Sequence, residues 1–154
     1  MCTINSKDSY MEIALREAKK ASLSGEVPVG AVLVNQNGEV IASYGNNCRQ
    51  NNDPTAHAEM EVIRLASKVL GSGRLSGCDL YVTLEPCPMC AQAISFARIK
   101  RLYYGASDPK GGGVENGPLI FSQPTCRHIP EIYSGINETQ SSELLKNFFI
   151  KRRV

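Results

Sequence analysis

The sequence predicts an α/β domain whose sheet is mainly parallel after a first hairpin. Two apolar runs separated by the turn residues "NQNG" predict the hairpin. Further apolar runs then alternate with segments of helical periodicity, as in α/β folds. The chain has 154 residues, of which 42% are hydrophobic, enough for one sizeable core. We therefore expect a single domain over residues 1–154.

In the first half of the chain, local signals fix where the elements should begin and end. Ser9 and Glu12 have the spacing of a capping box, and Gly25 is a helix-ending residue. Asp53 followed by Pro54 is typical of a helix start. The expected elements are a helix at 9–23, strands at 27–34 and 39–45, a polar loop at 46–53, and a helix from Asp53 to about 70.

The second half continues the alternation of strand and helix. Residues 108–137 are rich in Gly and Pro and are expected to be mostly loop, with one short strand near 131–133. The triple glycine at 111–113 lacks the Gly-Lys-Ser/Thr ending of a phosphate loop and is interpreted as flexible. The other expected elements are a strand at 78–84, a helix that begins at or near Cys87, a strand at 101–107 and a C-terminal helix at about 138–153.

The charge and the termini limit the possible partners. The net charge of +2 does not by itself predict nucleic-acid binding. Basic residues do gather in the last nine residues, which contain Lys146, Lys151, Arg152 and Arg153 and no acid. No signal peptide and no apolar run of about 18 residues is found, so a cytoplasmic protein without membrane contact is expected. Six cysteines are then thiols or metal ligands rather than disulfides.

Three residues form a candidate metal site. His57, Cys87 and Cys90 supply three ligands, whereas a structural zinc site is usually closed by four. Both cysteines should lie on one face of a helix start, and His57 is expected in the first turn of another helix. A catalytic zinc keeps one position open for water. A fourth ligand could in principle come from His128, Cys48, Cys78 or Cys126, but none of these belongs to a second metal-ligand pattern.

Glu59 adds a candidate catalytic group to this site. Residues two apart point about 200° apart on an ideal helix, so Glu59 is poorly placed to bind the same metal as His57. Near the helix end it could lie beside a metal-bound water and transfer its proton. The pattern H-x-E…P-C-x-x-C is that of zinc deaminases. A redox pair and a structural zinc site are the alternatives for Cys87 and Cys90.

Several longer stretches carry a family resemblance. With "VPVGAV", "DPTAHAE", "YVTLEPCPMC", "GASDPKGG" and "FFIKRR", the chain resembles the bacterial tRNA adenosine deaminases of the TadA type, within the cytidine deaminase superfamily. The resemblance extends over almost the whole chain. It departs from the family at Gln92, where glycine is usual. The implied fold is a three-layer α/β/α arrangement with a five-stranded mixed sheet, and the implied assembly is a homodimer.

The resemblance also implies roles for individual residues. One zinc per chain would be held by His57, Cys87 and Cys90, and Glu59 would shuttle protons. Glu59 would take a proton from water and pass it to N1 of adenine, hydroxide would add to C6, and ammonia would leave to give inosine. The implied substrate-binding residues are Asn46, Ala58, Asp108, Lys110, Phe149 and Arg152.

The implied substrate is the wobble adenosine in a tRNA anticodon stem-loop, by resemblance that of an arginine tRNA, and no DNA partner is expected. Guanine deaminases of the same superfamily share "DPTAHAE" and "EPCPMC", so a small-molecule deaminase acting on guanine, cytosine or a nucleoside is the alternative. The basic aromatic tail is evidence against it, because a free base needs no phosphate contacts. A non-catalytic zinc-bearing RNA-binding module is a third possibility, which Glu59 makes less attractive.

Overall fold

A mixed five-stranded sheet forms the middle layer of the protein, in a computed structural model that describes residues 7–152. The strand order is β2-β1-β3-β4-β5. β1 pairs antiparallel with both β2 and β3, whereas β3, β4 and β5 are parallel. The strands are β1 (Gly30–Val34), β2 (Val40–Gly45), β3 (Asp79–Leu84), β4 (Arg101–Ala106) and β5 (Glu131–Tyr133).

This topology confirms the mixed sheet and corrects one expectation. A mainly parallel sheet after the first hairpin is wrong for the β1–β3 pair, which is antiparallel. The reason is the crossover through α2 (Ala58–Leu70), which leaves from β2 at the edge and passes β1 before it enters β3. β3 therefore runs parallel to β2 and opposite to its neighbour β1.

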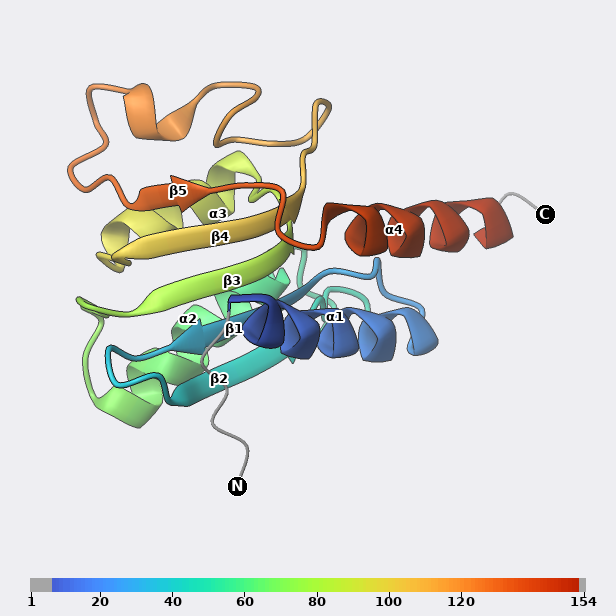
Figure 1. Ribbon diagram of the computed structural model, residues 1–154, viewed down its shortest axis with the longest axis horizontal. Coiled ribbons are helices and arrows are strands. Elements are labelled where there is room, and N and C mark those ends of the chain that lie inside the picture. Colours follow the sequence, from blue (N-terminus) through green and yellow to red (C-terminus); the bar gives the residue numbers. More distant parts are fainter. Residues whose placement is uncertain (1–6, 153–154) are drawn as a thin grey trace.

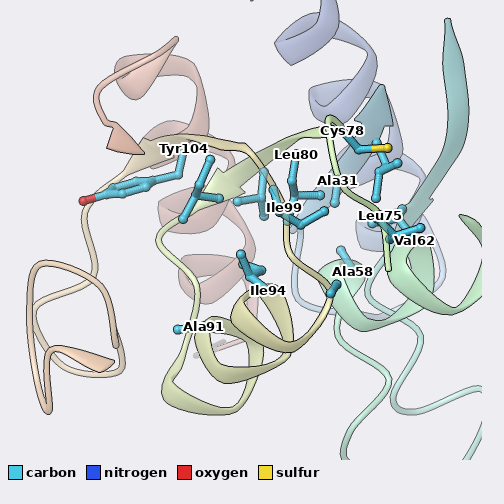
Figure 2. Packing of buried hydrophobic residues seen from close by; sticks show 14 of the residues in the cluster. Ala31, Ala58, Val62, Leu75, Cys78, Leu80, Ala91, Ile94, Ile99 and Tyr104 are labelled. Atoms are coloured by element: carbon cyan, nitrogen blue, oxygen red, sulfur yellow. The ribbon is translucent and has the colours of Figure 1, made fainter. Parts of the chain in front are cut away.

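Helices cover both faces of the sheet and give the expected three layers (Figure 1). α1 (Lys7–Leu23) and α4 (Glu138–Arg152) lie side by side on one face, and α2 and α3 (Pro88–Phe96) lie on the other. Alternate strand residues point to the two faces. The larger core therefore fills the space between the sheet and the α2–α3 layer (Figure 2), with buried members that include Leu33, Val62, Leu80, Ile94 and Ile99.

The first helix starts earlier than the sequence predicts. It begins at Lys7, so the residue at position 9 is already helical and cannot be an N-cap, whose backbone is extended. The predicted capping box is therefore wrong. The predicted end is confirmed, because Gly25 follows the helix with a positive φ of 83°, a conformation that glycine adopts without a steric cost.

Two paired glycines let α1 lie directly on the hairpin. Gly30 of β1 is opposite Gly45 of β2 in the strand register. A Cβ atom at Gly30 would lie 1.9 Å from the carbonyl oxygen of Ala14, and one at Gly45 would lie 2.7 Å from that of Glu17. The buried stripe of α1, which includes Met11, Ala14 and Ala18, requires this close approach.

A stack of tyrosines crosses the face of the sheet beneath α1. Tyr81, Tyr103 and Tyr133 are in register on β3, β4 and β5. Their ring centroids are 4.4 and 4.9 Å apart in nearly parallel pairs, and Tyr10 of α1 lies 5.2 Å from Tyr81. Such cross-strand aromatic pairs stabilise a sheet and its register.

The segment between β4 and α4 is more structured than the sequence suggested. The short strand β5 is confirmed at Glu131–Tyr133, and a 3-10 turn at Ile120–Ser122 was not predicted. Across residues 7–152, no helix has both the length and the apolar character needed to span a membrane.

Candidate metal and catalytic site

His57 stands immediately before α2, which starts at Ala58 and not at Asp53. The Asp53 carboxylate accepts hydrogen bonds from the backbone N–H of Thr55, at 2.8 Å, and from its hydroxyl, at 2.7 Å. Asp53 thus closes a local turn, which competes with helix formation. The predicted helix start is wrong. His57 is the extended N-cap residue rather than a residue of the first helical turn.

His57, Cys87 and Cys90 meet in one cluster. Cys87 is the N-cap residue of α3, as predicted, and Cys90 follows one turn later. Nδ1 of His57 lies 3.6 Å from Sγ of Cys87 and 3.5 Å from Sγ of Cys90. Tetrahedral zinc, with bonds of about 2.3 Å to sulfur and about 2.0–2.1 Å to nitrogen, would place these atoms about 3.6 Å apart. The donor set therefore fits a zinc ion.

No fourth His, Cys, Asp or Glu joins this cluster among the described residues. Sγ of Cys126 contacts the hydroxyl of Ser95 at 3.4 Å, and Nε2 of His128 lies 2.7 Å from the carbonyl oxygen of Ile99. Sγ of Cys48 faces the carbonyl oxygen of Pro54. The cluster therefore has the three-ligand composition of a catalytic zinc site.

Two helix N-termini converge on the cluster, because His57 caps α2 and Cys87 caps α3. Each N-terminus carries partial positive charge, which favours thiolate over thiol. The contact with Cys90, joined by that with His57, lowers the pKa of Cys87 to about 4 despite burial. The same contact with Cys87, together with burial, raises the pKa of Cys90. A bound cation would deprotonate both thiols.

Glu59 is the buried acid of the site. It is the second residue of α2, its side chain is 3% exposed, and it lines the same cavity as His57 and Cys87. Burial raises the pKa of its carboxyl. A carboxyl that is less acidic than usual can both accept and return a proton near neutral pH.

The cavity beside these residues has a volume of about 310 Å³, in the range typical of small-ligand pockets. Asn46 and Asp108, two of the residues predicted to contact the substrate, line it. Ala58 is buried and contacts Asn46 through its backbone, whose N–H donates to Oδ1 of Asn46 at 2.8 Å. Apolar walls come from Val27, Val29 and Leu84.

Comparison with known proteins identifies the family. Residues 4–106 match the family described as "Cytidine and deoxycytidylate deaminase zinc-binding region". The tRNA-specific adenosine deaminase of Agrobacterium fabrum is 61% identical, over 94% of this chain and 95% of the relative. That of Bacillus subtilis is 46% identical, over 94% and 89%. The chain belongs to the tRNA-specific adenosine deaminase family.

Solved structures agree with this assignment. A structure from studies of A-to-I editing by tRNA:A34 deaminases is 63% identical and has a TM-score of 0.87, over 88% of this deaminase and 98% of that chain. A guanine deaminase from Bacillus subtilis is 33% identical with a TM-score of 0.64, over 97% and 96%. The expected resemblance, the three-layer fold and the zinc cofactor are therefore confirmed.

The tail of the deaminase is only partly as expected. Phe149 is 47% exposed and Phe148 is buried. The guanidinium of Arg152 lies 4.6 Å above the ring of Phe148, not that of Phe149, and donates to the carbonyl oxygen of Gly25 at 2.6 Å. Arg152 therefore joins α4 to the end of α1. Arg153 lies outside the described residues.

Sequence reasoning missed two buried acids in the deaminase, Glu26 and Glu85, which are each 2% exposed. Both oxygens of Glu26 accept the backbone N–H of Arg49, at 3.1 and 3.0 Å, which holds the loop that carries Asn46. Glu85 lines the cavity and binds the loop after β4. The available signal was an acid inside an otherwise apolar stretch, in "GEVPVG" and "VTLEPC".

Proposed function

We propose that this protein deaminates adenosine to inosine at the wobble position of a tRNA anticodon loop, by zinc-dependent hydrolysis that releases ammonia. The observation that carries the proposal is that the buried Glu59 lines one cavity together with His57 and Cys87, two of the three candidate metal ligands. A purely structural zinc site needs no acid beside it and usually has a fourth protein ligand. This arrangement is typical of hydrolytic deaminases.

The relatives support the choice of substrate. The curated relatives from Agrobacterium fabrum, Rickettsia typhi and Bacillus subtilis are named tRNA-specific adenosine deaminases, at 61%, 49% and 46% identity over more than nine tenths of this chain. The solved structure at 63% identity comes from work on tRNA:A34 deaminases at the wobble position. The guanine deaminase likeness is weaker, at 33% identity.

In this proposal His57, Cys87 and Cys90 would hold a zinc ion, which would lower the pKa of a water molecule toward neutrality. Glu59 accepts a proton from the attacking water and delivers it to N1 of the adenine. The water oxygen bonds to C6 as the C6=N1 double bond opens and N1 takes the first proton. Glu59 then transfers the proton of the new C6 hydroxyl to the amino group. The C6–N bond then breaks and ammonia leaves, so that adenosine and water become inosine and ammonia.

The cavity walls would hold the base for this reaction. Because Oδ1 of Asn46 accepts the N–H of Ala58, its NH2 group is left to donate toward a ligand. Val27, Val29 and Leu84 offer apolar surface to a flat ring. A base must leave its stack to enter such a pocket, which costs least in a single-stranded loop.

The flanking nucleotides would meet one residue of the cavity wall and residues beyond it. Asp108 lines the cavity, Lys110 follows it on an exposed stretch, and Phe149 offers an exposed ring. An exposed aromatic ring and nearby cations suit stacked bases and phosphates. Arg152 would act at the same end of the molecule, although it also contacts Gly25 and Phe148.

The proposal extends to the organisation of the protein. We place residues 1–154 in one domain, because α4 packs on β4 and α1. A homodimer is supported by exposed apolar side chains on α2 and α3, namely Val69 and Phe96, which are 61% and 73% exposed. We also propose a cytoplasmic location, in keeping with the tRNA-specific relatives, and an arginine tRNA substrate, for which the family resemblance is the support.

An inosine assay tests the proposal. Zinc-loaded protein is incubated with an anticodon stem-loop that carries adenosine at the wobble position, and separately with guanine, cytosine and adenosine. Inosine in the stem-loop, absent with a Glu59→Gln control, is the expected result. Efficient guanine deamination without turnover of the stem-loop would establish the small-molecule alternative instead. Binding of the stem-loop with no deamination would indicate a non-catalytic module.

A further inference from the structure

The loop at 107–116 is wrapped around the carboxylate of Glu85. One oxygen, Oε2, accepts the N–H groups of three consecutive residues, Val114, Glu115 and Asn116, at 3.0–3.1 Å. Successive amides that point at one spot form an anion-binding nest. Here the anion is a side chain of the same molecule.

The second oxygen of Glu85 holds the other end of the same loop. Oε1 accepts the N–H of Asp108 at 3.0 Å and the side-chain NH2 of Asn116 at 2.6 Å, with the hydroxyl of Ser107 at 3.4 Å. Every group around the carboxylate is thus a donor. An ionised carboxylate only accepts hydrogen bonds and offers about four lone-pair sites, so it can pair with all of these donors. A glutamine of the same shape would instead present an NH2 donor to them.

The same packing gives Gly112 and Gly113 a steric role, beyond the flexible loop that the sequence predicts. A Cβ atom at Gly112 would lie 2.4 Å from Oε2 of Glu85, and one at Gly113 would lie 2.6 Å from the nitrogen of Pro88. Gly113 also donates its N–H to the carbonyl oxygen of Pro86 at 2.8 Å. The loop therefore lies closely against the segment that carries Cys87.

This loop is one wall of the cavity. Asp108 and Gly111 line the cavity together with Val27 and Val29 of the segment before β1. Asp108 is fixed at its backbone by Glu85, and its own carboxylate accepts the N–H of Gly111 at 3.0 Å. The position of the wall thus depends on the charge of one buried side chain.

We propose that Glu85 is a positioning residue that sets the affinity of the deaminase for its substrate. Its carboxylate holds the 107–116 loop in the shape that receives the substrate, while Glu59 carries out the proton transfers. The assignment rests on the proposed function, because substrate affinity is what it predicts. Loss of the carboxylate charge should weaken substrate binding and leave the chemical step and the metal cluster largely intact.

The variants are chosen to separate this role from general stability. Glu85→Gln removes the charge and turns an NH2 group toward N–H donors, whereas Glu85→Asp keeps the charge on a shorter side chain. Ile99→Val is the stability control, because it trims a fully buried core residue, a change that typically has a modest cost. Glu131→Gln is the charge control, since that exposed carboxylate pairs with Arg101 where β4 and β5 begin, at the other end of β4 from the 107–116 loop.

Three measurements are made on zinc-loaded protein: zinc content, amide hydrogen exchange at residues 114–116, and kcat and KM with the anticodon stem-loop. The cost of leaving a buried donor unsatisfied corresponds to about a 10- to 100-fold change in an equilibrium constant, here that of substrate binding. For Glu85→Gln we expect faster exchange at 114–116 and a KM raised about 10-fold or more. The kcat should stay within about 3-fold and the zinc content should be unchanged. Glu85→Asp should recover part of the affinity, and both controls should keep the KM of the unaltered protein.

Two results would overturn the proposal. One is a KM that stays unchanged in Glu85→Gln while exchange at 114–116 becomes faster. The other is a loss of zinc together with kcat, which would make Glu85 a support of the metal site. If the unaltered protein does not deaminate the stem-loop, the proposed tRNA function is wrong, whatever the role of Glu85. The KM comparison is then made with whichever base or nucleoside the protein does deaminate, and the same two results decide the role of Glu85.

Discussion

Asn46 accepts the backbone N–H of Ala58 at 2.8 Å, and so joins the loop after β2 to the residue that lies between His57 and Glu59. The donor is a backbone amide, so Asn46 must turn its carbonyl oxygen toward α2 and its NH2 group away from it. One side chain thus supports the start of the catalytic helix and lines the cavity.

Two substitutions of Asn46 should separate these roles. Asn46→Asp keeps an oxygen for Ala58 and removes the NH2 donors, so we expect near-normal stability and a turnover reduced about 10-fold or more. Asn46→Ala removes both groups and should also lower the free energy of unfolding by about 1–3 kcal/mol. Denaturant unfolding and stem-loop kinetics measure the two effects. Unchanged kinetics in Asn46→Asp would contradict contact with the base.

The metal ligands can be tested one at a time. Cys87→Ala removes a sulfur that lies 3.6 Å from Nδ1 of His57, so zinc content should fall well below one ion per chain and activity should be lost. Metal analysis of the purified protein provides the measurement. Cys126→Ala is the matched control, because that thiol contacts Ser95 and lies outside the cluster, and it should retain its zinc.

Glu59→Gln should lose activity while it keeps the metal. Glu59 is not part of the ligand cluster, so zinc and fold should be retained. Turnover should drop by about 10²- to 10⁴-fold, which is the typical contribution of general acid–base catalysis. Quench assays for inosine together with zinc analysis distinguish this outcome from loss of the metal. A near-normal rate would remove Glu59 from the mechanism.

The contact between α1 and the hairpin gives a prediction about stability alone. Gly30→Ala would place a methyl group 1.9 Å from the carbonyl oxygen of Ala14. Because that neighbour is backbone, the whole helix must shift, and we expect a loss of at least about 1–3 kcal/mol in the free energy of unfolding. Gly73→Ala is the control, since nothing lies within 4 Å of a Cβ atom there. Thermal or denaturant unfolding compares the two.

Two neighbouring cations of α4, Lys151 and Arg152, should differ in what their substitution changes. Lys151 is exposed, whereas Arg152 donates to the carbonyl oxygen of Gly25 and covers Phe148. Lys151→Glu should weaken stem-loop binding and flatten its salt dependence, with stability unchanged. Arg152→Ala should in addition lower stability. Affinity at several salt concentrations and unfolding measurements test this, and stem-loop binding by Lys151→Glu like that of the unaltered protein would leave the tail with a structural role.

The sequence predicted those features that depend on local signals. Cys87 and Cys90 share a helix start, and His57 lies two residues before Glu59 at another helix start. This spacing, together with the known H-x-E…P-C-x-x-C pattern of zinc deaminases, was enough to propose the cluster. Local signals also misled at two helix starts. The capping box at Ser9 and Glu12 does not mark the start of α1. Asp53 and Pro54 have the composition of a helix start, yet Thr55 uses the Asp53 carboxylate for a turn. An Asp-Pro pair is compatible with a helix start and with a local turn, and the packing of the folded chain decides which of the two forms.

Features set by distant partners could not be predicted. β1 pairs antiparallel with β3 because the α2 crossover starts from the edge strand β2 and places β3 on the other side of β1. The donors to Glu85 lie 22–31 residues further along the chain, so no window of sequence around it contains them. Arg152 likewise finds Gly25 at a separation of 127 residues.

The tyrosine stack has a practical consequence for spectroscopy. The chain has no tryptophan, so tyrosine dominates its near-ultraviolet absorption and emission. Of the six tyrosines, three form the stack and Tyr10 makes a tilted contact with one end of it. Stacked rings held at fixed angles couple their electronic transitions, and the resulting circular dichroism disappears when the rings separate. The stack and Tyr10 together span α1, β3, β4 and β5, so this one optical signal reports whether the helix and three strands are assembled without any label being added.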